Sequence, residues 1–331
     1  MLVACDLFSS SIKFQRINDS AYKKIKKKIK NIQIIKIAPE RTNNFDLKNV
    51  EIYWGNRITS DLIEKMPNLK WIHYGSTGIS KKIYKPVFQK KIKVTNTQKT
   101  FSSAVSGTVL SFMFSLARGV HYCNFLKNKK RLTRPYFDKI SEDIQDVYEQ
   151  NILIVGLGDI GLKIAKTCNA LEMNVSSINK NGKKIPTYIK KNYKLDNLIN
   201  AVKDKDFIVS LLPLTNNTKE IFDKNIFNAM KKKSIFINVG RGGTVNEKDL
   251  LNALKKNKIL GAGLDVVTNE PINSKSPFLK LKNVLVTPHI AGVTNKYWDD
   301  QILLFSENLM RYKNNHKLKN LKNYSSIKEG Y

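Results

Sequence analysis

The chain has 331 residues, and 58 Lys and Arg against 27 Asp and Glu give it a formal net charge of +31. This length favours two domains over a single core, and no apolar run is long enough to span a bilayer. Only eight of the basic residues are Arg, and the lysines are scattered along the whole chain. This scatter argues against a specific nucleic-acid or membrane partner, while non-specific adhesion to polyanions stays open.

The three cysteines, Cys5, Cys123 and Cys168, lie far apart and lack the spacing of metal ligands. We expect small buried thiols that stay reduced, which is typical of a cytoplasmic protein. The apolar run at the N-terminus has no basic residues before it, so no secretory signal is expected. We therefore expect a cytoplasmic protein with no metal site.

The first hundred residues alternate short apolar strands with helical stretches. Strands are expected at 2–4, 32–37, 51–54, 71–74 and 92–95, and helices near 19–30 and 60–66. Thr59, Ser60 and Asp61 open the second of these helices and are typical capping residues. This alternation predicts a parallel sheet covered by helices on both faces.

One long apolar helix is expected from 103 to 127, followed by an irregular polar connection over 128–150. Small residues on this helix, among them Ala104, Gly107 and Ala117, indicate that it packs tightly against another surface. Core packing and a dimer contact are the two alternatives for that surface.

A second series of strands and helices begins with four apolar residues, 152–155, and a glycine-rich turn. Gly156 permits the tight turn, Gly158 lets the backbone approach a pyrophosphate, and Gly161 lets the next helix pack close to the strand. The N–H groups at the start of that helix would point at the phosphates. The strand before the turn and the helix after it favour a dinucleotide site over a purely structural turn.

Six strands in this second series predict a doubly wound parallel sheet of the size that binds dinucleotides. They are expected at 151–155, 173–179, 206–211, 234–238, 260–264 and 283–286. An amphipathic helix from 294 to about 313 follows, and we expect the Lys- and Asn-rich tail after it to be loosely held.

Three segments at expected strand ends bring together one Arg, one Glu and one His. They contain Arg241, Glu270 and His289, and the carboxyl ends of parallel strands converge on one crevice. A guanidinium can bind a carboxylate with two parallel bonds, an imidazole can exchange a proton with a carbonyl or hydroxyl oxygen, and a carboxylate can orient that imidazole. With a nicotinamide, these groups suffice for hydride transfer to a 2-keto acid. Taken singly, each residue has a plainer alternative: a core histidine, a turn residue or a phosphate ligand.

Residues from about 100 to 310 resemble the D-isomer-specific 2-hydroxyacid dehydrogenases. The matching phrases are Gly156-Leu-Gly-Asp-Ile-Gly161, Leu211-Leu-Pro-Leu-Thr215, Asn238-Val-Gly-Arg-Gly242, Gly263-Leu-Asp-Val266, Glu270-Pro271 and Thr287-Pro-His-Ile-Ala-Gly292. The resemblance implies an α/β protein with a Rossmann nucleotide domain over 101–292. It also implies a smaller, flavodoxin-like α/β substrate domain made of 1–100 and 293–331. A homodimer that interconverts a small anionic 2-keto acid and its D-2-hydroxy acid is implied as well.

The resemblance also implies roles for individual residues. Arg241 would bind the substrate, His289 would be the acid/base, and Glu270 would support it. The implied cofactor contacts are Gly156, Gly158, Asp159, Ile160 and Gly161 at the pyrophosphate, Pro213, Val239 and Gly240 beside the nicotinamide, Asp265 on its carboxamide, and Gly292. The phrase from Leu69 to Gly78 resembles the family's substrate loop, in which the backbone of Ser76, Thr77 and Gly78 would hold the carboxylate.

The chain departs from the family pattern at two places. Ser106-Gly107 stands where many members have Ala-Glu, so a contact from that position is in doubt. Asn179 and Lys180 stand where an acidic residue is expected to accept from the ribose 2′-OH. A carboxylate would repel a 2′-phosphate, whereas Asn and Lys would accept it. This favours NADP(H), with NAD(H) as the alternative because Lys is abundant everywhere in the chain.

The sequence is also compatible with a function that is not catalytic. Transcriptional corepressors of the same fold bind the nucleotide as a ligand without catalysis, and the Arg, Glu and His residues do not exclude that function. The identity of the 2-keto acid is not determined by the sequence.

Overall fold

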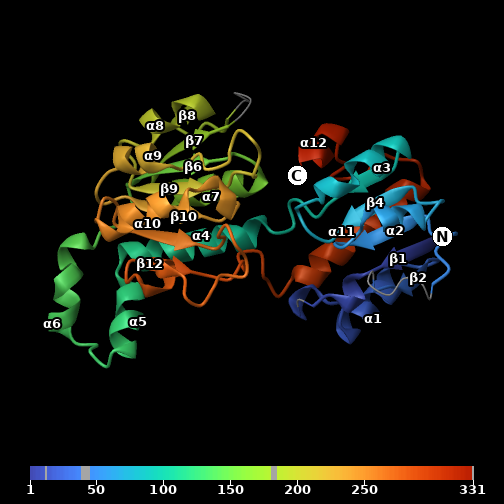
Figure 1. Cartoon of the computed structure of the whole chain (residues 1–331), viewed down its shortest axis with the longest axis horizontal. Coiled ribbons are helices and arrows are strands. Elements are labelled where there is room, and N and C mark those ends of the chain that lie inside the picture. Colours follow the sequence, from blue (N-terminus) through green and yellow to red (C-terminus); the bar gives the residue numbers. More distant parts are fainter. Residues whose placement is uncertain (12, 39–44, 180–184, 330–331) are drawn as a thin grey trace. The chain divides into compact units, whose positions relative to one another are not determined.

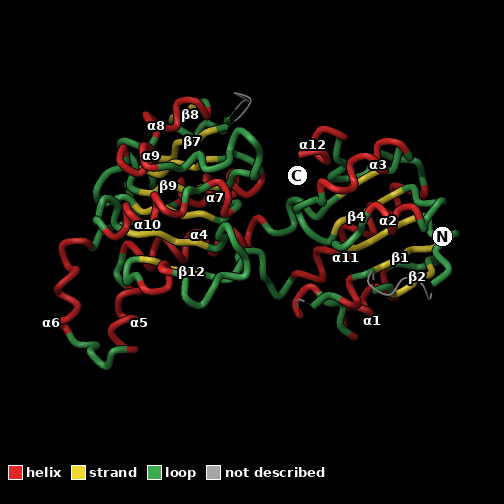
Figure 2. The backbone as a smooth tube through the Cα atoms, in the orientation of Figure 1, coloured by secondary structure: helices red, strands yellow, loops and turns green. Residues whose placement is uncertain are grey.

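The computed structural model describes residues 1–11, 13–38, 45–179 and 185–329. The chain divides into two compact units, each built on its own sheet (Figures 1 and 2). The first unit comprises Met1–Phe101 and Val293–Tyr331, and the second comprises Ser102–Gly292.

A parallel five-stranded sheet, counted over the described residues, forms the centre of the first unit. Its strands in spatial order are β2 (Gln33–Lys36), β1 (Leu2–Cys5), β3 (Ile52–Gly55), β4 (Trp71–Tyr74) and β5 (Lys93–Thr95). This 2-1-3-4-5 order is the flavodoxin-like doubly wound order. The α/β class and the flavodoxin-like topology predicted for this part of the chain are confirmed.

Helices cover both faces of this sheet (Figure 1). The α-helices are α1 (Asp19–Lys28), α2 (Ser60–Glu64), α3 (Tyr84–Gln89), α11 (Tyr297–Lys313) and α12 (Tyr324–Glu329), with short 3₁₀ turns η1 (Leu7–Ser9), η2 (Lys13–Gln15) and η4 (Lys81–Ile83). One buried cluster joins α1 and α11 to the sheet, and a second joins α2, α3 and α12 to the other face. The expected cap at Thr59 is present, because its hydroxyl accepts from the Leu62 amide at 3.2 Å.

The expectation of a loosely held tail is wrong. Leu318 and Ile327 are buried in the two clusters of the first unit, and α12 packs against α3. The Lys322 amide also donates to the Val94 carbonyl at 2.9 Å. Widely spaced apolar residues in a lysine-rich segment do not form a pattern of their own, so only the surface they pack against reveals their role.

The second unit is built on a parallel sheet of seven strands among the described residues. In spatial order they are β12 (Val284–Val286), β11 (Gly261–Leu264), β10 (Ile235–Asn238), β9 (Phe207–Ser210), β6 (Asn151–Val155), β7 (Asn174–Ile178) and β8 (Lys191–Tyr193). The order reverses between β6 and β9, as in the doubly wound Rossmann arrangement that was predicted. The prediction of six strands missed β8, a short polar strand at the sheet edge that lacks an apolar run.

Two layers of helices sandwich this sheet. The α-helices are α4 (Ser102–Ala117), α5 (Val120–Asn128), α6 (Arg134–Phe137), α7 (Asp159–Ala170), α8 (Leu198–Ala201), α9 (Lys224–Ala229) and α10 (Glu247–Lys255), with 3₁₀ turns η5 (Asp138–Asp143), η6 (Leu195–Asn197), η7 (Gly242–Thr244) and η8 (Pro277–Lys280). Residues of α8, α9 and α10 share one buried cluster, and residues of α4 and α7 share the other. Of the two alternatives for α4, core packing is therefore the one that the structure shows, because α4 packs against the sheet and α7.

The single helix predicted over 103–127 is wrong, because the chain breaks between α4 and α5 with a bend of 71°. Gly119 has a φ of 69° at the break, in the left-handed region that favours glycine. The connection expected to be irregular contains α6 and η5. No single helix in the described part of the chain is long and apolar enough to cross a membrane, although the bent α4–α5 pair has sufficient length and apolar composition when counted together.

Candidate active site

The glycine turn lies between β6 and α7, where the strand order reverses. Gly156 has a φ of 110°, and a Cβ at Gly161 would come within 2.3 Å of the Gly156 carbonyl oxygen. A Cβ at Gly158 would meet nothing within 4 Å, and no side chain caps the first turn of α7. Two glycines are thus required by the backbone, and the third opens space at uncapped helix amides. This arrangement fits the phosphates of a dinucleotide.

Two buried polar atoms beside this turn have no hydrogen-bond partner among the described residues. They are Oδ1 of Asn179, just after β7, and Oγ of Ser210, at the end of β9. These strands flank β6 on its two sides. Buried polar atoms are normally paired, so two unpaired ones at strand ends fit a polar ligand there. Lys180 lies outside the described residues.

Arg241 follows β10, and hydrogen bonds with Gly240 and Asn238 hold it in place. Its Nη1 donates to the Gly240 carbonyl at 2.7 Å, and the side-chain amide of Asn238 donates to the Arg241 carbonyl at 3.2 Å. Burial lowers the pKa of the Arg241 guanidinium, and the charge of Glu270 opposes that shift. The guanidinium therefore lies within electrostatic reach of Glu270 in a partly desolvated position, where a carboxylate would bind strongly.

His289 and Glu270 form a hydrogen-bonded pair, with 2.7 Å between Nδ1 of the imidazole and Oε2 of the carboxylate. A carboxylate accepts, so Nδ1 carries the donated proton and Nε2 is the ring nitrogen left for another partner. The second carboxylate oxygen accepts from the Val267 amide at 3.3 Å, which fixes the side chain. The His289 side chain is about half exposed (51%), so this imidazole can reach a substrate.

Asp265 anchors the turn that carries His289. One of its carboxylate oxygens accepts from the Thr287 hydroxyl at 2.6 Å and from the amides of Ile290 and Ala291 at 2.8 and 3.1 Å. The His289 amide donates to the Asp265 carbonyl at 2.9 Å, and His289 itself has a φ of 54°. A non-glycine residue in that region needs such support. Gly292 follows Ala291 at the end of this turn and is the last residue of the second unit.

The segments expected beside the nicotinamide lie at neighbouring strand ends. Pro213 follows β9, and Val239 and Gly240 follow β10, which pairs with β9. A Cβ at Gly240 would come within 2.8 Å of the Leu212 carbonyl oxygen, so the two loops are in contact. The Thr218 hydroxyl holds the Pro213 carbonyl at 2.5 Å.

Within the second unit, the structure therefore brings together the predicted residues at the carboxyl ends of β6, β9, β10, β11 and β12. Asn238, Thr287 and Ser210 also contribute side chains to this candidate site, although the sequence did not predict them as site residues. Each is a polar residue at or just beyond the end of an apolar strand, and this signal could have identified them.

In the first unit, Ser76, Thr77 and Gly78 follow β4, and their carbonyls are all bound within that unit. These carbonyls accept from the Thr97 amide (3.3 Å), the Asn96 side-chain amide (2.6 Å) and the Ser76 hydroxyl (3.0 Å), respectively. Their own N–H groups donate to no partner among the described residues. Unpaired N–H groups on successive residues form an anion-binding arrangement.

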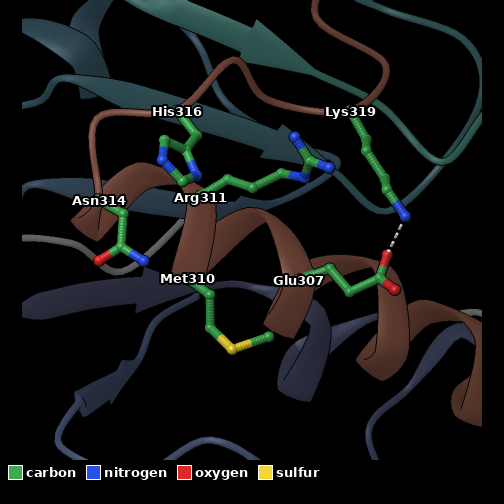
Figure 3. Close-up of a pocket in the computed structure, with 6 residues that line it drawn as sticks. All are labelled: Glu307, Met310, Arg311, Asn314, His316 and Lys319. Atoms are coloured by element: carbon green, nitrogen blue, oxygen red, sulfur yellow. Dashed lines mark hydrogen bonds and ion pairs between the residues drawn. The ribbon is translucent and has the colours of Figure 1, made fainter.

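Two hollows on the surface are separate from these residues. One, of about 250 Å³, lies on the C-terminal turns of α11 and the loop after it (Figure 3), and the ion pair of Glu307 with Lys319 at 2.7 Å closes one side. The other, of about 360 Å³, lies between α5 and α6. Neither is lined by any predicted site residue. No cluster of metal-ligating side chains occurs in the described ranges.

Comparison with known proteins identifies the family. Residues 110–291 match the model of the "D-isomer specific 2-hydroxyacid dehydrogenase, NAD binding domain". The chain is 31% identical over 276 residues to the "Probable 2-ketogluconate reductase" of Dictyostelium discoideum, covering 82% of this chain and 81% of that protein. It is 30% identical over 247 residues to the glyoxylate/hydroxypyruvate reductase B of Escherichia coli, covering 72% and 73%.

A solved structure agrees over nearly the whole chain. A D-isomer specific 2-hydroxyacid dehydrogenase family protein of Aeromonas salmonicida superposes with a TM-score of 0.81 and 25% identity, covering 98% of each chain. The chain belongs to the D-isomer specific 2-hydroxyacid dehydrogenase family. This family member is an NAD(P)-dependent oxidoreductase with a Rossmann-type nucleotide domain. The enzyme is therefore favoured over the corepressor alternative.

Proposed function

We propose that this dehydrogenase interconverts a small anionic 2-keto acid and its D-2-hydroxy acid. When bound, a nicotinamide cofactor would supply the hydride to C2 of the keto acid, or accept it from the hydroxy acid. His289 gives its Nε2 proton to the substrate oxygen during reduction and takes it back in the reverse direction. The observation that carries this proposal is the 2.7 Å bond from His289 to Glu270, which leaves Nε2 for that proton transfer.

The substrate anion is proposed to bind two groups. Arg241 binds the carboxylate and polarises the carbonyl, which its partly desolvated guanidinium suits. In the first unit, the unpaired N–H groups of Ser76, Thr77 and Gly78 are the proposed carboxylate-binding groups, so this unit is proposed as the substrate domain and the second unit as the nucleotide domain. The relatives' names give glyoxylate, hydroxypyruvate and 2-ketogluconate as the first substrates to try.

The cofactor is proposed to lie along the carboxyl ends of β6, β7, β9 and β10, with NADP(H) preferred. Gly156, Gly158, Asp159, Ile160 and Gly161 would hold the pyrophosphate, Asn179 and Lys180 the 2′-phosphate, and Pro213, Val239, Gly240, Asp265 and Gly292 the nicotinamide half. The unpartnered Asn179 Oδ1 supports a ligand at the end of β7. An amide there does not repel a phosphate as a carboxylate would.

Two properties of the whole enzyme complete the proposal. We propose a homodimer through the nucleotide domain, supported by exposed apolar side chains on and around α5 and α6. We also propose a cytoplasmic location, supported by the absence of disulfides among Cys5, Cys123 and Cys168.

Replacing His289 with Asn tests the acid/base role. The wild type and His289→Asn are assayed with glyoxylate, hydroxypyruvate and 2-ketogluconate, with NADH and NADPH in parallel. We expect kcat to fall by at least about a hundredfold with cofactor affinity retained, because general acid–base catalysis contributes about 10² to 10⁴ in rate.

The matched control is His316→Asn, which replaces an exposed histidine and should keep wild-type turnover. Parental turnover by His289→Asn on a substrate that the wild type reduces would refute the acid/base assignment. Nucleotide binding by the wild type without turnover of any keto acid would favour the corepressor alternative, and higher kcat/KM with NADH would refute the cofactor preference.

A further inference from the structure

The carbonyl of Gly75, just before the candidate carboxylate loop, is held by two side chains of α11. The Gln301 Nε2 donates to it at 3.0 Å and the Tyr297 hydroxyl donates at 3.3 Å. Both side chains are buried, and Gln301 is fully so. Two separate donors thus fix one backbone oxygen across more than two hundred residues of sequence.

Holding this oxygen determines where the next N–H points. In a trans peptide the C=O of one residue and the N–H of the next are coplanar and point in opposite directions. The Gly75 carbonyl faces α11, so the Ser76 N–H faces away from α11. Asn96 acts in the same way two residues later, because its side-chain amide donates to the Thr77 carbonyl and so orients the Gly78 N–H.

We propose that Tyr297 and Gln301 are positioning residues that aim the Ser76 N–H at the substrate carboxylate. This inference rests on the proposed carboxylate-binding role of the Ser76–Gly78 loop. Neither side chain touches the reacting atoms, and their effect passes through the Gly75 carbonyl.

The surroundings of the two side chains support a positioning role over a packing role. Gln301 Oε1 is buried and has no partner among the described residues, which makes this side chain poorer for core stability than an apolar one. The Tyr297 ring is fixed by an edge contact with Phe14 and a stack on Phe101, with centroids 5.4 and 5.5 Å away. Burial raises the pKa of Tyr297, so its hydroxyl keeps the proton that it donates.

The test compares Tyr297→Phe, Gln301→Leu and the double variant with the wild type. Titration calorimetry with oxalate, at saturating NADPH, measures carboxylate binding without turnover, and steady-state assays give KM and kcat for the best keto acid of the panel. Removing both donors should raise the oxalate Kd and the KM by about tenfold, as expected for losing about one hydrogen bond's free energy. The NADPH Kd and kcat should stay within about twofold.

Asn308→Leu is the matched control, since Asn308 is a fully buried amide on the same helix that binds Lys319 instead of the loop. It should lower thermal stability and leave the oxalate Kd unchanged. An equal rise of Kd in Asn308→Leu, or none in the folded Tyr297→Phe and Gln301→Leu variants, would overturn the inference. Absence of oxalate binding by the wild type would also overturn it. Wild-type oxalate binding with no keto-acid turnover, together with weaker binding by the variants, would uphold the inference and overturn the proposed function.

Discussion

For His289, the sequence predicts the identity of the site residue but not its orientation. Its phrase, Thr287-Pro-His, and its place after an expected strand are local features, and they identify it together with Glu270. The 2.7 Å bond that joins the two, and the anchoring of their turn by Asp265, depend on strands that meet only in the sheet. Sequence could therefore predict the chemical groups, while their orientation came from packing.

Another histidine, His73, illustrates the opposite case. Its side chain lies fully buried on β4, with Nδ1 bonded to the Thr95 hydroxyl at 2.7 Å and its ring beside Trp54, Trp71 and Phe305. Burial lowers the pKa of His73 to about 3 from its ordinary value of 6.5. The chain has four histidines, and the burial of His73 assigns this one to the core.

The buried His73 should make the stability of the fold depend on pH. Because its folded-state pKa is depressed, the folded chain binds fewer protons than the unfolded chain below pH 6.5. The stabilisation is present above that pH and is lost as the pH falls towards 3. Between pH 7 and pH 5 this group should lower the free energy of unfolding by about 2 kcal/mol.

Urea denaturation at both pH values measures this loss in the wild type and in His73→Gln. The variant should show a loss that is smaller by about 2 kcal/mol, since glutamine does not titrate. His316→Gln, at an exposed position, should keep the wild-type pH dependence. An unchanged pH dependence in His73→Gln would contradict the prediction.

At the scale of elements, the sequence predicted those helices, strands and turns whose own residues carry a recognisable pattern. The cap at Thr59, the apolar strands and the glycine turn were all predicted, because each depends on neighbours in the chain. The misses included β8, α12 and the break between α4 and α5. In these cases a polar or evenly apolar segment takes its shape from the surface it packs against.

Gly119 produces that break, and its substitution should be costly. A Cβ there would come within 2.8 Å of Ile144 and 3.0 Å of Ile140, and the backbone is left-handed. We expect Gly119→Ala to destabilise the second unit by about 2 to 3 kcal/mol, from backbone strain and overpacking together. The midpoint and slope of urea denaturation, followed by circular dichroism, measure this change.

Gly107 on α4 is the matched control for the same substitution. A Cβ there would meet nothing within 4 Å, and the residue is exposed in the middle of a helix. Gly107→Ala should therefore stabilise the fold by about 0.5 to 1 kcal/mol. Equal effects of the two substitutions would show that the break does not depend on Gly119.

At the scale of the whole molecule, the arm formed by α5 and α6 bears on assembly. In Figure 1 it extends away from the sheet of the second unit. Val120, Phe125, Leu132 and Tyr148, on and near this arm, are all exposed. Exposed apolar side chains gathered on one projection are typical of a protein–protein contact.

The proposed homodimer should dissociate when this arm becomes charged. Light scattering during size-exclusion chromatography measures the mass of the wild type and of Val120→Glu/Phe125→Glu. We expect a dimer for the wild type and at least about a hundredfold weaker association for the variant, because buried apolar anchors carry most of the binding free energy. Leu303→Glu, at an exposed apolar residue of α11, is the control and should stay dimeric. A wild-type monomer would refute the proposal.

The sequence by itself determined the α/β class, the glycine turn, the strand-end position of Arg241, Glu270 and His289, and through them the family. These features lie in short runs of neighbouring residues, where spacing and residue type suffice. The tertiary structure decided the contacts between segments far apart in the chain. These are the hydrogen bonds from the His289 turn to Asp265, and those from Tyr297 and Gln301 to the Gly75 carbonyl. Such contacts depend on how strands and helices pack, and no local pattern records that packing.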